Sequence, residues 1–160
     1  MKRVYFLLFT CTISILIFSC GQSNNNTAGS SEKPKSMVPD AESYDPKRGE
    51  GKFSADNVKV DAKLDAALAA TGEKIVNTKC ASCHKMSTEK LVGPGWAGVT
   101  TRRKPEWIMN FITNPDPMLN KDPEAKAMLE LCLVRMPNQS LTDDDARNIL
   151  EFMRKNDGIK

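Results

Sequence analysis

The chain has 160 residues, enough for one domain with a hydrophobic core. Its formal charge is +3, but two of the 23 basic residues are Lys2 and Arg3, so 21 basic side chains face 20 acidic ones in the rest of the chain. This balance excludes nucleic acid as a plausible partner, because a nucleic-acid-binding protein needs a strongly basic surface.

The N-terminus has the pattern of an export signal. Lys2 and Arg3 precede a mostly apolar run, Val4 to Phe18, which is shorter than the roughly 20 apolar residues that cross a bilayer. Residues 1–19 are therefore predicted to be a signal peptide, and we expect the chain to be exported.

The apolar run ends at Ile17-Phe18-Ser19-Cys20-Gly21, which resembles the lipobox of bacterial lipoproteins. The resemblance implies that Cys20 is lipidated and becomes the first residue of the mature protein. It also implies a protein anchored at a membrane and facing the periplasm, with inner and outer membrane both open. Phe18 departs from the small residue usual at that position, so an ordinary cleavage site and an uncleaved anchor are the alternatives.

A change in composition separates the N-terminal part from the rest. Residues 21–36 are small and polar, which predicts a flexible spacer that buries too little apolar surface to fold. Residues 37–60 contain several Pro and Gly and have little periodicity, so we expect an extended segment that lies partly on the domain. We therefore assign residues 20–60 to a lipid-anchored linker with its extended segment, and residues 61–160 to one domain.

Four segments of the domain have apolar residues at helical spacing behind a capping residue or a proline. They begin at Asp65, Pro105, Asp122 and Thr142. The first should run into Cys80, whereas residues 115–118 are expected to form a loop. Because no alternating strand pattern occurs, the sequence predicts an all-α domain.

Cys80-Ala81-Ser82-Cys83-His84 has the C-x-x-C-H pattern of covalent haem attachment. Two thiols one helical turn apart can reach both haem vinyl groups, and the adjoining His then reaches the iron from one face. A redox dithiol would need a βαβ setting, and a zinc site with Cys132 would need the neighbours Cys83 and His84 on one ion. A simple disulfide leaves His84, the only His, without a role. We therefore predict one covalent haem c held by Cys80 and Cys83, with His84 as an axial iron ligand.

Over about residues 65–156 the chain resembles the class I cytochrome c family. Family members place a Gly and an aliphatic or aromatic residue at four-residue steps before the first haem Cys, and here Gly72 and Val76 precede Cys80 at that spacing. The resemblance implies an all-α class I cytochrome c fold, with helices wrapped around the haem and the first helix packed on the last. The expected partners on the last helix are Ile149, Leu150, Phe152 and Met153.

The stretch from Leu91 to Val99 resembles the family's Gly-Pro loop on the His side of the haem. In the family, the proline carbonyl accepts a hydrogen bond from the axial His, which fixes the orientation of the ring. The resemblance assigns this role to Pro94 and His84. The alternative is that the loop is a Gly/Pro turn with no role at the haem. The chain departs from the family pattern at Trp96, where family members commonly have Leu.

With a single His, the sixth iron ligand has to be a methionine, another side chain or water. Methionines inside predicted helices suit core packing, and Met86 lies too close to His84 to reach the opposite haem face. Met118, in the predicted loop, is the competitor. Met136, in Arg135-Met136-Pro137-Asn138 before the last helix, resembles the family's axial methionine, which implies His84/Met136 ligation.

Several other residues have two open interpretations each. Trp107 either donates to a haem propionate or packs in the core, and the basic run 102–104 either neutralises propionates or solvates a turn. Cys132 is expected to be a buried, inert thiol, and a redox or intermolecular role is the alternative. The lysines around the attachment motif either steer acidic partners or solvate the surface: Lys74, Lys79, Lys85 and Lys90.

These predictions converge on an electron carrier rather than an enzyme, because two axial ligands leave no position for a small-molecule substrate on the iron. We expect a shuttle between a quinol-oxidising complex and a terminal oxidase or reductase, with redox proteins of unknown identity as partners and the membrane contacted through the lipid anchor. The alternative is a fixed haem c subunit of a larger respiratory oxidoreductase. A haem enzyme or gas sensor would need an open iron position.

Overall fold

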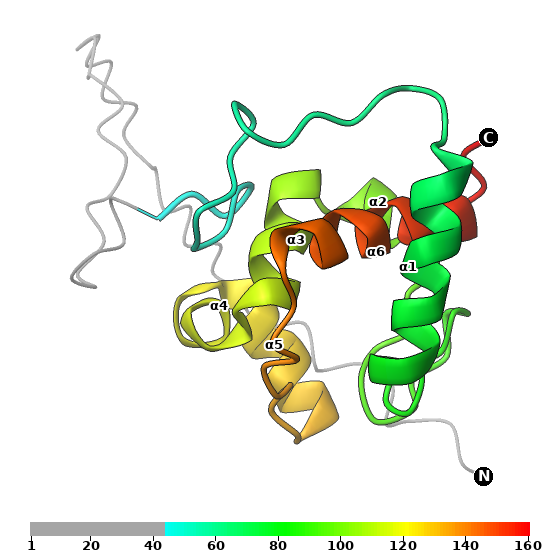
Figure 1. The fold of residues 1–160 in the computed structure, drawn as a ribbon. Coiled ribbons are helices and arrows are strands. Elements are labelled where there is room, and N and C mark those ends of the chain that lie inside the picture. Colours follow the sequence, from blue (N-terminus) through cyan, green and yellow to red (C-terminus); the bar gives the residue numbers. More distant parts are fainter. Residues whose placement is uncertain (1–43) are drawn as a thin grey trace, which may run out of the picture. The chain divides into compact units, whose positions relative to one another are not determined.

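The structure is a computed structural model that describes residues 44–160, so the predicted signal peptide, Cys20 and the first part of the linker lie outside the described residues. The described part contains six helices and no strand, which confirms the predicted all-α class (Figure 1). The helices are α1 Ala66–Lys79, α2 Val99–Arg102, α3 Pro105–Thr113, α4 Pro115–Lys121, α5 Pro123–Cys132 and α6 Asp143–Asn156. None of these six is both long and apolar enough to span a membrane.

Short-range side-chain contacts start the longer helices where the sequence predicts. Asp65 caps α1 by accepting hydrogen bonds from the backbone N–H groups of Ala67 and Leu68. Thr142 starts α6 with a capping box, in which its hydroxyl accepts from the N–H of Asp145 and the Asp145 carboxylate accepts from the N–H of Thr142. Helices α3 and α5 begin with a proline at their first position.

One local prediction is wrong. Residues 115–118, expected as a loop, form the first turn of α4. Pro115 occupies the first position of this helix, where a residue without an N–H group costs no intrahelical hydrogen bond. The prolines that suggested a loop therefore mark a helix start instead.

Helix α1 crosses α6 in close contact (Figure 1). A Cβ atom on Gly72 would lie 2.0 Å from the carbonyl oxygen of Asn148, so only a glycine allows this approach. Val76, one turn further along α1, is fully buried, and the four expected partners on α6 are buried as well. The predicted packing role of Gly72 and Val76 is confirmed.

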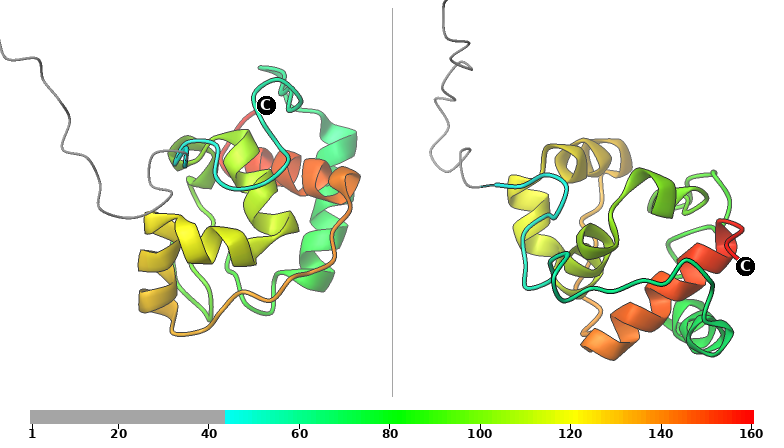
Figure 2. Two further views of the ribbon diagram at one scale, coloured as in Figure 1. Left: turned by 90° about the vertical axis from the view of Figure 1, so that its left-hand side faces the viewer. Right: turned by 90° about the horizontal axis from the view of Figure 1, so that it is seen from above.

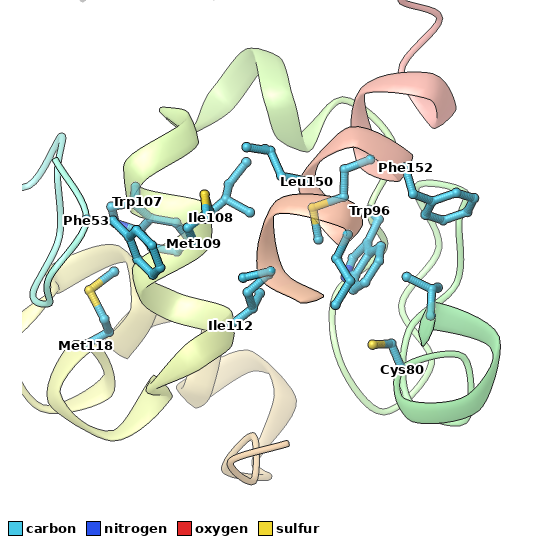
Figure 3. Packing of buried hydrophobic residues seen from close by; sticks show 14 of the residues in the cluster. Phe53, Cys80, Trp96, Trp107, Ile108, Met109, Ile112, Met118, Leu150 and Phe152 are labelled. Atoms are coloured by element: carbon cyan, nitrogen blue, oxygen red, sulfur yellow. The ribbon is translucent and has the colours of Figure 1, made fainter. Parts of the chain in front are cut away.

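Residues 44–60 lie along the helices before the chain enters α1, in cyan to green in both views of Figure 2. Phe53 and Val58 are buried in the hydrophobic core, which also contains Trp107 and Met118 (Figure 3). The N–H of Phe53 donates to Oδ1 of Asn110 at 2.9 Å, and Nδ2 of Asn110 donates back to the carbonyl of Phe53 at 3.0 Å. The expectation that part of the extended segment lies on the domain is confirmed for these residues.

A buried carboxylate joins α6 to the start of α1. Glu151 is 0% exposed and accepts from the N–H of Asp65 at 2.8 Å. It also accepts from Arg147 at 2.5 Å and from Arg154 at 2.6 Å. Burial alone raises the pKa of this carboxyl, but the N–H and guanidinium donors outweigh burial and hold the pKa below its usual value.

Candidate haem site

The attachment motif lies at the C-terminal end of α1. The N–H of Cys80 donates to the carbonyl of Val76 at 2.9 Å, which closes the helix, and the N–H of His84 donates to the carbonyl of Cys80 at 2.9 Å. This turn brings Cys80, Cys83 and His84 to the wall of one cavity of about 390 Å³.

The rest of the cavity wall comes from distant parts of the chain. The end of α1, the loop after the motif, α3, α4, α5 and the connection between α5 and α6 all contribute to it. The mainly apolar residues on this wall include Val92, Pro94, Phe111, Leu119, Met128, Leu129, Val134 and Met136. An apolar cavity with two thiols and one imidazole fits a haem c, whose macrocycle is flat and apolar and whose vinyl groups take up the thiols.

A hydrogen bond to the loop that follows the motif orients the imidazole of His84. Its Nδ1 donates to the carbonyl oxygen of Pro94 at 2.9 Å, as predicted. Burial lowers the pKa of His84, and the hydrogen bond to Pro94 opposes this effect only in part. Burial therefore favours the neutral imidazole, and because the Pro94 carbonyl can only accept, the proton lies on Nδ1 and leaves the Nε2 lone pair for a metal.

Because Gly93 has no side chain, the loop backbone can approach the imidazole of His84 closely. A Cβ atom on Gly93 would lie 2.4 Å from Cε1 of His84 and 2.8 Å from its Nδ1. The Trp96 ring also lies beside the imidazole, with 5.3 Å between the ring centroids. The sequence places Gly93 in the Gly-Pro loop directly before Pro94, but the close approach of its backbone to the imidazole is visible only in the structure.

The two thiols do not match the alternatives to haem attachment. Cys80 and Cys83 form no disulfide, and burial raises the pKa of the Cys80 thiol to about 11, whereas a redox dithiol needs a lowered pKa. Within residues 44–160 no group of three or more His, Cys, Asp or Glu residues is placed to hold a metal ion, which removes support for a zinc site. Cys132 is half-buried rather than buried, because the end of α5 faces the cavity.

The structure separates the methionines that compete for the sixth iron position. Met136 lies in the connection between α5 and α6 and lines the cavity. Met118 does not line it: its side chain is fully buried, and its Sδ accepts from the N–H of Glu50 at 2.8 Å. Met128 on α5, expected to serve core packing, is a further methionine on the cavity wall.

Trp107 packs in the core and does not line the cavity. Its Nε1 donates to Oδ2 of Asp122 at 3.0 Å, and its ring stacks on Phe111 at 5.1 Å between centroids. Arg103 lies over the same ring, with Cζ 4.6 Å from the centroid. Of the two interpretations of Trp107, core packing is confirmed, and its indole N–H serves Asp122.

The basic run 102–104 makes local contacts. Arg102 donates to the carbonyl of Ala97 at 2.7 Å, and Arg103 forms an ion pair with Glu124. No residue of the run lines the cavity, so a role in neutralising propionates has no support.

Comparisons with known proteins agree with this geometry. The family model described as "Cytochrome c" matches residues 69–157. Cytochrome c from Rhodothermus marinus is 35% identical with a TM-score of 0.62, and the alignment covers 66% of this chain and 90% of that chain. An engineered cytochrome c from the same organism, Rma TDE, is 34% identical with a TM-score of 0.61 over the same shares. The same engineered protein bound to a carbene intermediate is 34% identical with a TM-score of 0.58, again over 66% and 90%. No curated protein matches the chain.

The family match spans more than half of the chain and includes the attachment motif, Pro94 and Met136. The solved relatives share its helical arrangement at more than 30% identity. The chain therefore belongs to the cytochrome c family: it has the all-α class I fold, carries covalently bound haem c and transfers electrons.

Proposed function

We propose that this protein is a one-electron carrier whose haem iron is ligated by His84 and Met136. It works at the periplasmic surface of a membrane, between a quinol-oxidising complex and a terminal oxidase or reductase. The observation that carries the proposal is the cavity, whose wall includes both the imidazole of His84 and the thioether of Met136. The haem supplies reversible one-electron chemistry when bound, and an axial thioether raises its potential.

The groups of the protein hold the haem and adjust the reduction potential of its iron, and they take no part in a chemical reaction. The Pro94 carbonyl fixes the proton of His84 on Nδ1, which keeps the ligand in one tautomer in both redox states. The apolar wall disfavours an extra positive charge in the cavity and so favours reduced iron. Two axial side chains leave no iron position for a substrate, which supports a carrier rather than an enzyme.

Replacement of Met136 tests the ligation directly. In the Met136→Ala protein the haem stays covalently attached, but the Met-to-iron charge-transfer band of the ferric form disappears and the reduced form binds carbon monoxide. Met128→Leu is the matched control, because Met128 lines the same cavity, and that variant keeps the band. A band that survives in Met136→Ala would assign the ligand to another residue.

The position at the membrane rests on the signal peptide and on the lipobox-like residues 17–21. Acyl chains on Cys20 insert into the bilayer, and each buried methylene contributes about 0.8 kcal/mol. We expect Cys20→Ser protein to move from the detergent phase to the aqueous phase, whereas Cys11→Ser, which changes a cysteine inside the signal peptide, leaves the partitioning unchanged. Processed Cys20→Ser protein that stays in the detergent phase would contradict the anchor.

A further inference from the structure

The connection between α5 and α6, residues 133–142, is named here the Met136 loop. Residues 134–141 form no backbone-to-backbone hydrogen bond with any part of the chain that the structure describes. Leu133 has φ of 60° and Ser140 has φ of 51°, so the loop is bracketed by two non-glycine residues in the left-handed region, where a side chain is strained. Leu133 is also 85% exposed. The backbone of the loop therefore does not hold Met136 in place by itself.

One side chain ties this loop to α1. Nζ of Lys79 donates to the carbonyl oxygen of Gln139 at 2.9 Å. Lys79 is the last residue of α1 and directly precedes Cys80, and both Lys79 and Gln139 line the cavity. In the left view of Figure 2 the Met136 loop, in orange, passes the end of α1. Because the acceptor is a backbone atom, the contact fixes the path of the chain just after Met136.

A second side chain ties the loop to α4. Nε of Arg135 donates to Oδ1 of Asp116 at 3.2 Å, and Nη2 of Arg135 donates to Oδ1 of Asn120 at 2.9 Å. Arg135 directly precedes Met136, so the two contacts hold the chain on either side of the methionine. They connect the loop to two different helices, one of which directly precedes the haem attachment motif.

We infer that Lys79 and Arg135 are positioning residues that hold Met136 at the iron. The inference rests on the ligation proposed above. Both contacts are exposed to solvent, with the Arg135 and Asp116 side chains 45% and 66% exposed, so each contributes modestly and salt weakens the ion pair. Loss of either contact therefore favours opening of the loop, and opening would release Met136 from the iron.

Imidazole binding to the ferric, haem-loaded protein measures the rate of this opening. Imidazole reaches the iron only after Met136 has left, so the limiting rate at high imidazole is the rate of loop opening. We expect Lys79→Met and Arg135→Gln each to raise the limiting rate by about threefold or more. Lys79→Arg keeps a donor and retains the wild-type rate. Added salt accelerates opening in the wild type more than in Arg135→Gln.

Lys74→Met is the matched control. Lys74 is exposed on the same helix, and its ammonium makes no hydrogen bond or ion pair within residues 44–160. The inference would be overturned if Lys79→Met and Lys74→Met had the same limiting rate. It would also be overturned if denaturant unfolding showed that a lower free energy of unfolding of the whole protein accounts for the higher rate. A wild-type protein without the Met-to-iron band would contradict the ligation itself, whereas a normal band with unchanged rates contradicts only the positioning role.

Discussion

Three residues of a single loop determine the tautomer and the packing of His84, the residue that defines the site. The carbonyl of Pro94 sets the tautomer, Gly93 leaves room for the ring, and Trp96 packs beside it. The hydrogen bond to Pro94 could be predicted because it connects a motif with a loop of recognisable pattern. The Gly93 contact could not, because it depends on the approach of the loop backbone to the ring face.

Glu151 makes the stability of the fold depend on pH. Its pKa is lower in the folded chain than its usual value, so its stabilisation is present above the unfolded pKa, about 4.3, and is lost as the pH falls through the folded pKa. Glu151→Gln leaves Arg154, which is 7% exposed, without its buried charge partner. We expect a loss of about 3 kcal/mol in the free energy of unfolding at neutral pH.

Denaturant unfolding of the haem-loaded proteins across the acidic range checks this prediction. The difference between wild type and Glu151→Gln should shrink as the pH falls below about 4, because Glu151 itself becomes neutral. Glu130→Gln, at an exposed position on α5, should unfold like the wild type at every pH. A Glu151→Gln difference that stays constant with pH would show that lost packing, and not charge, causes the loss.

At the scale of elements, the local sequence predicts correctly where the longer helices begin. It does not predict correctly which segments between them lack regular structure. Asp65 and Thr142 form caps with residues at most three positions away, so their effect is visible in the sequence. The helix that begins at Pro115 was missed because proline is found both in loops and at the first position of a helix. Neither Leu133 nor Ser140 is a residue type that signals a left-handed backbone.

The crossing of α1 and α6 tolerates no side chain at Gly72. A methyl group there would lie 2.0 Å from the Asn148 oxygen and 2.6 Å from its carbonyl carbon, both backbone atoms that cannot move independently. We expect Gly72→Ala to destabilise the haem-loaded protein by about 1–3 kcal/mol, even though alanine favours helices by about 1 kcal/mol. Thermal unfolding measures the change.

The matched control for this crossing is Asn77→Ala, at an exposed position of the same helix. It gains helix propensity without touching α6, so its unfolding temperature should equal or slightly exceed that of the wild type. A Gly72→Ala protein as stable as Asn77→Ala would mean that the two helices do not approach as closely as the structure has them.

At the scale of the whole molecule, the cavity and the segment before α1 depend on contacts between distant residues. Tyr44 donates to Oδ2 of Asp122 at 2.5 Å, and Phe53 is fixed by Asn110, which anchors residues 44–60 to α3 and to the start of α5. Such pairs leave no local pattern. The attachment motif could be predicted because its residues are neighbours in the sequence. The hydrogen bonds of Lys79 and Arg135 could not, because their partners are distant in the sequence.

A redox titration of the purified, haem-loaded wild-type protein, followed by visible and near-infrared spectra, tests the central claim most directly. We predict a single one-electron transition, a Met-to-iron charge-transfer band in the ferric form, and a ferrous form that does not bind carbon monoxide. A ferric form without that band, together with rapid carbon monoxide binding to the ferrous form, would mean an open iron position and would contradict the assignment as an electron carrier.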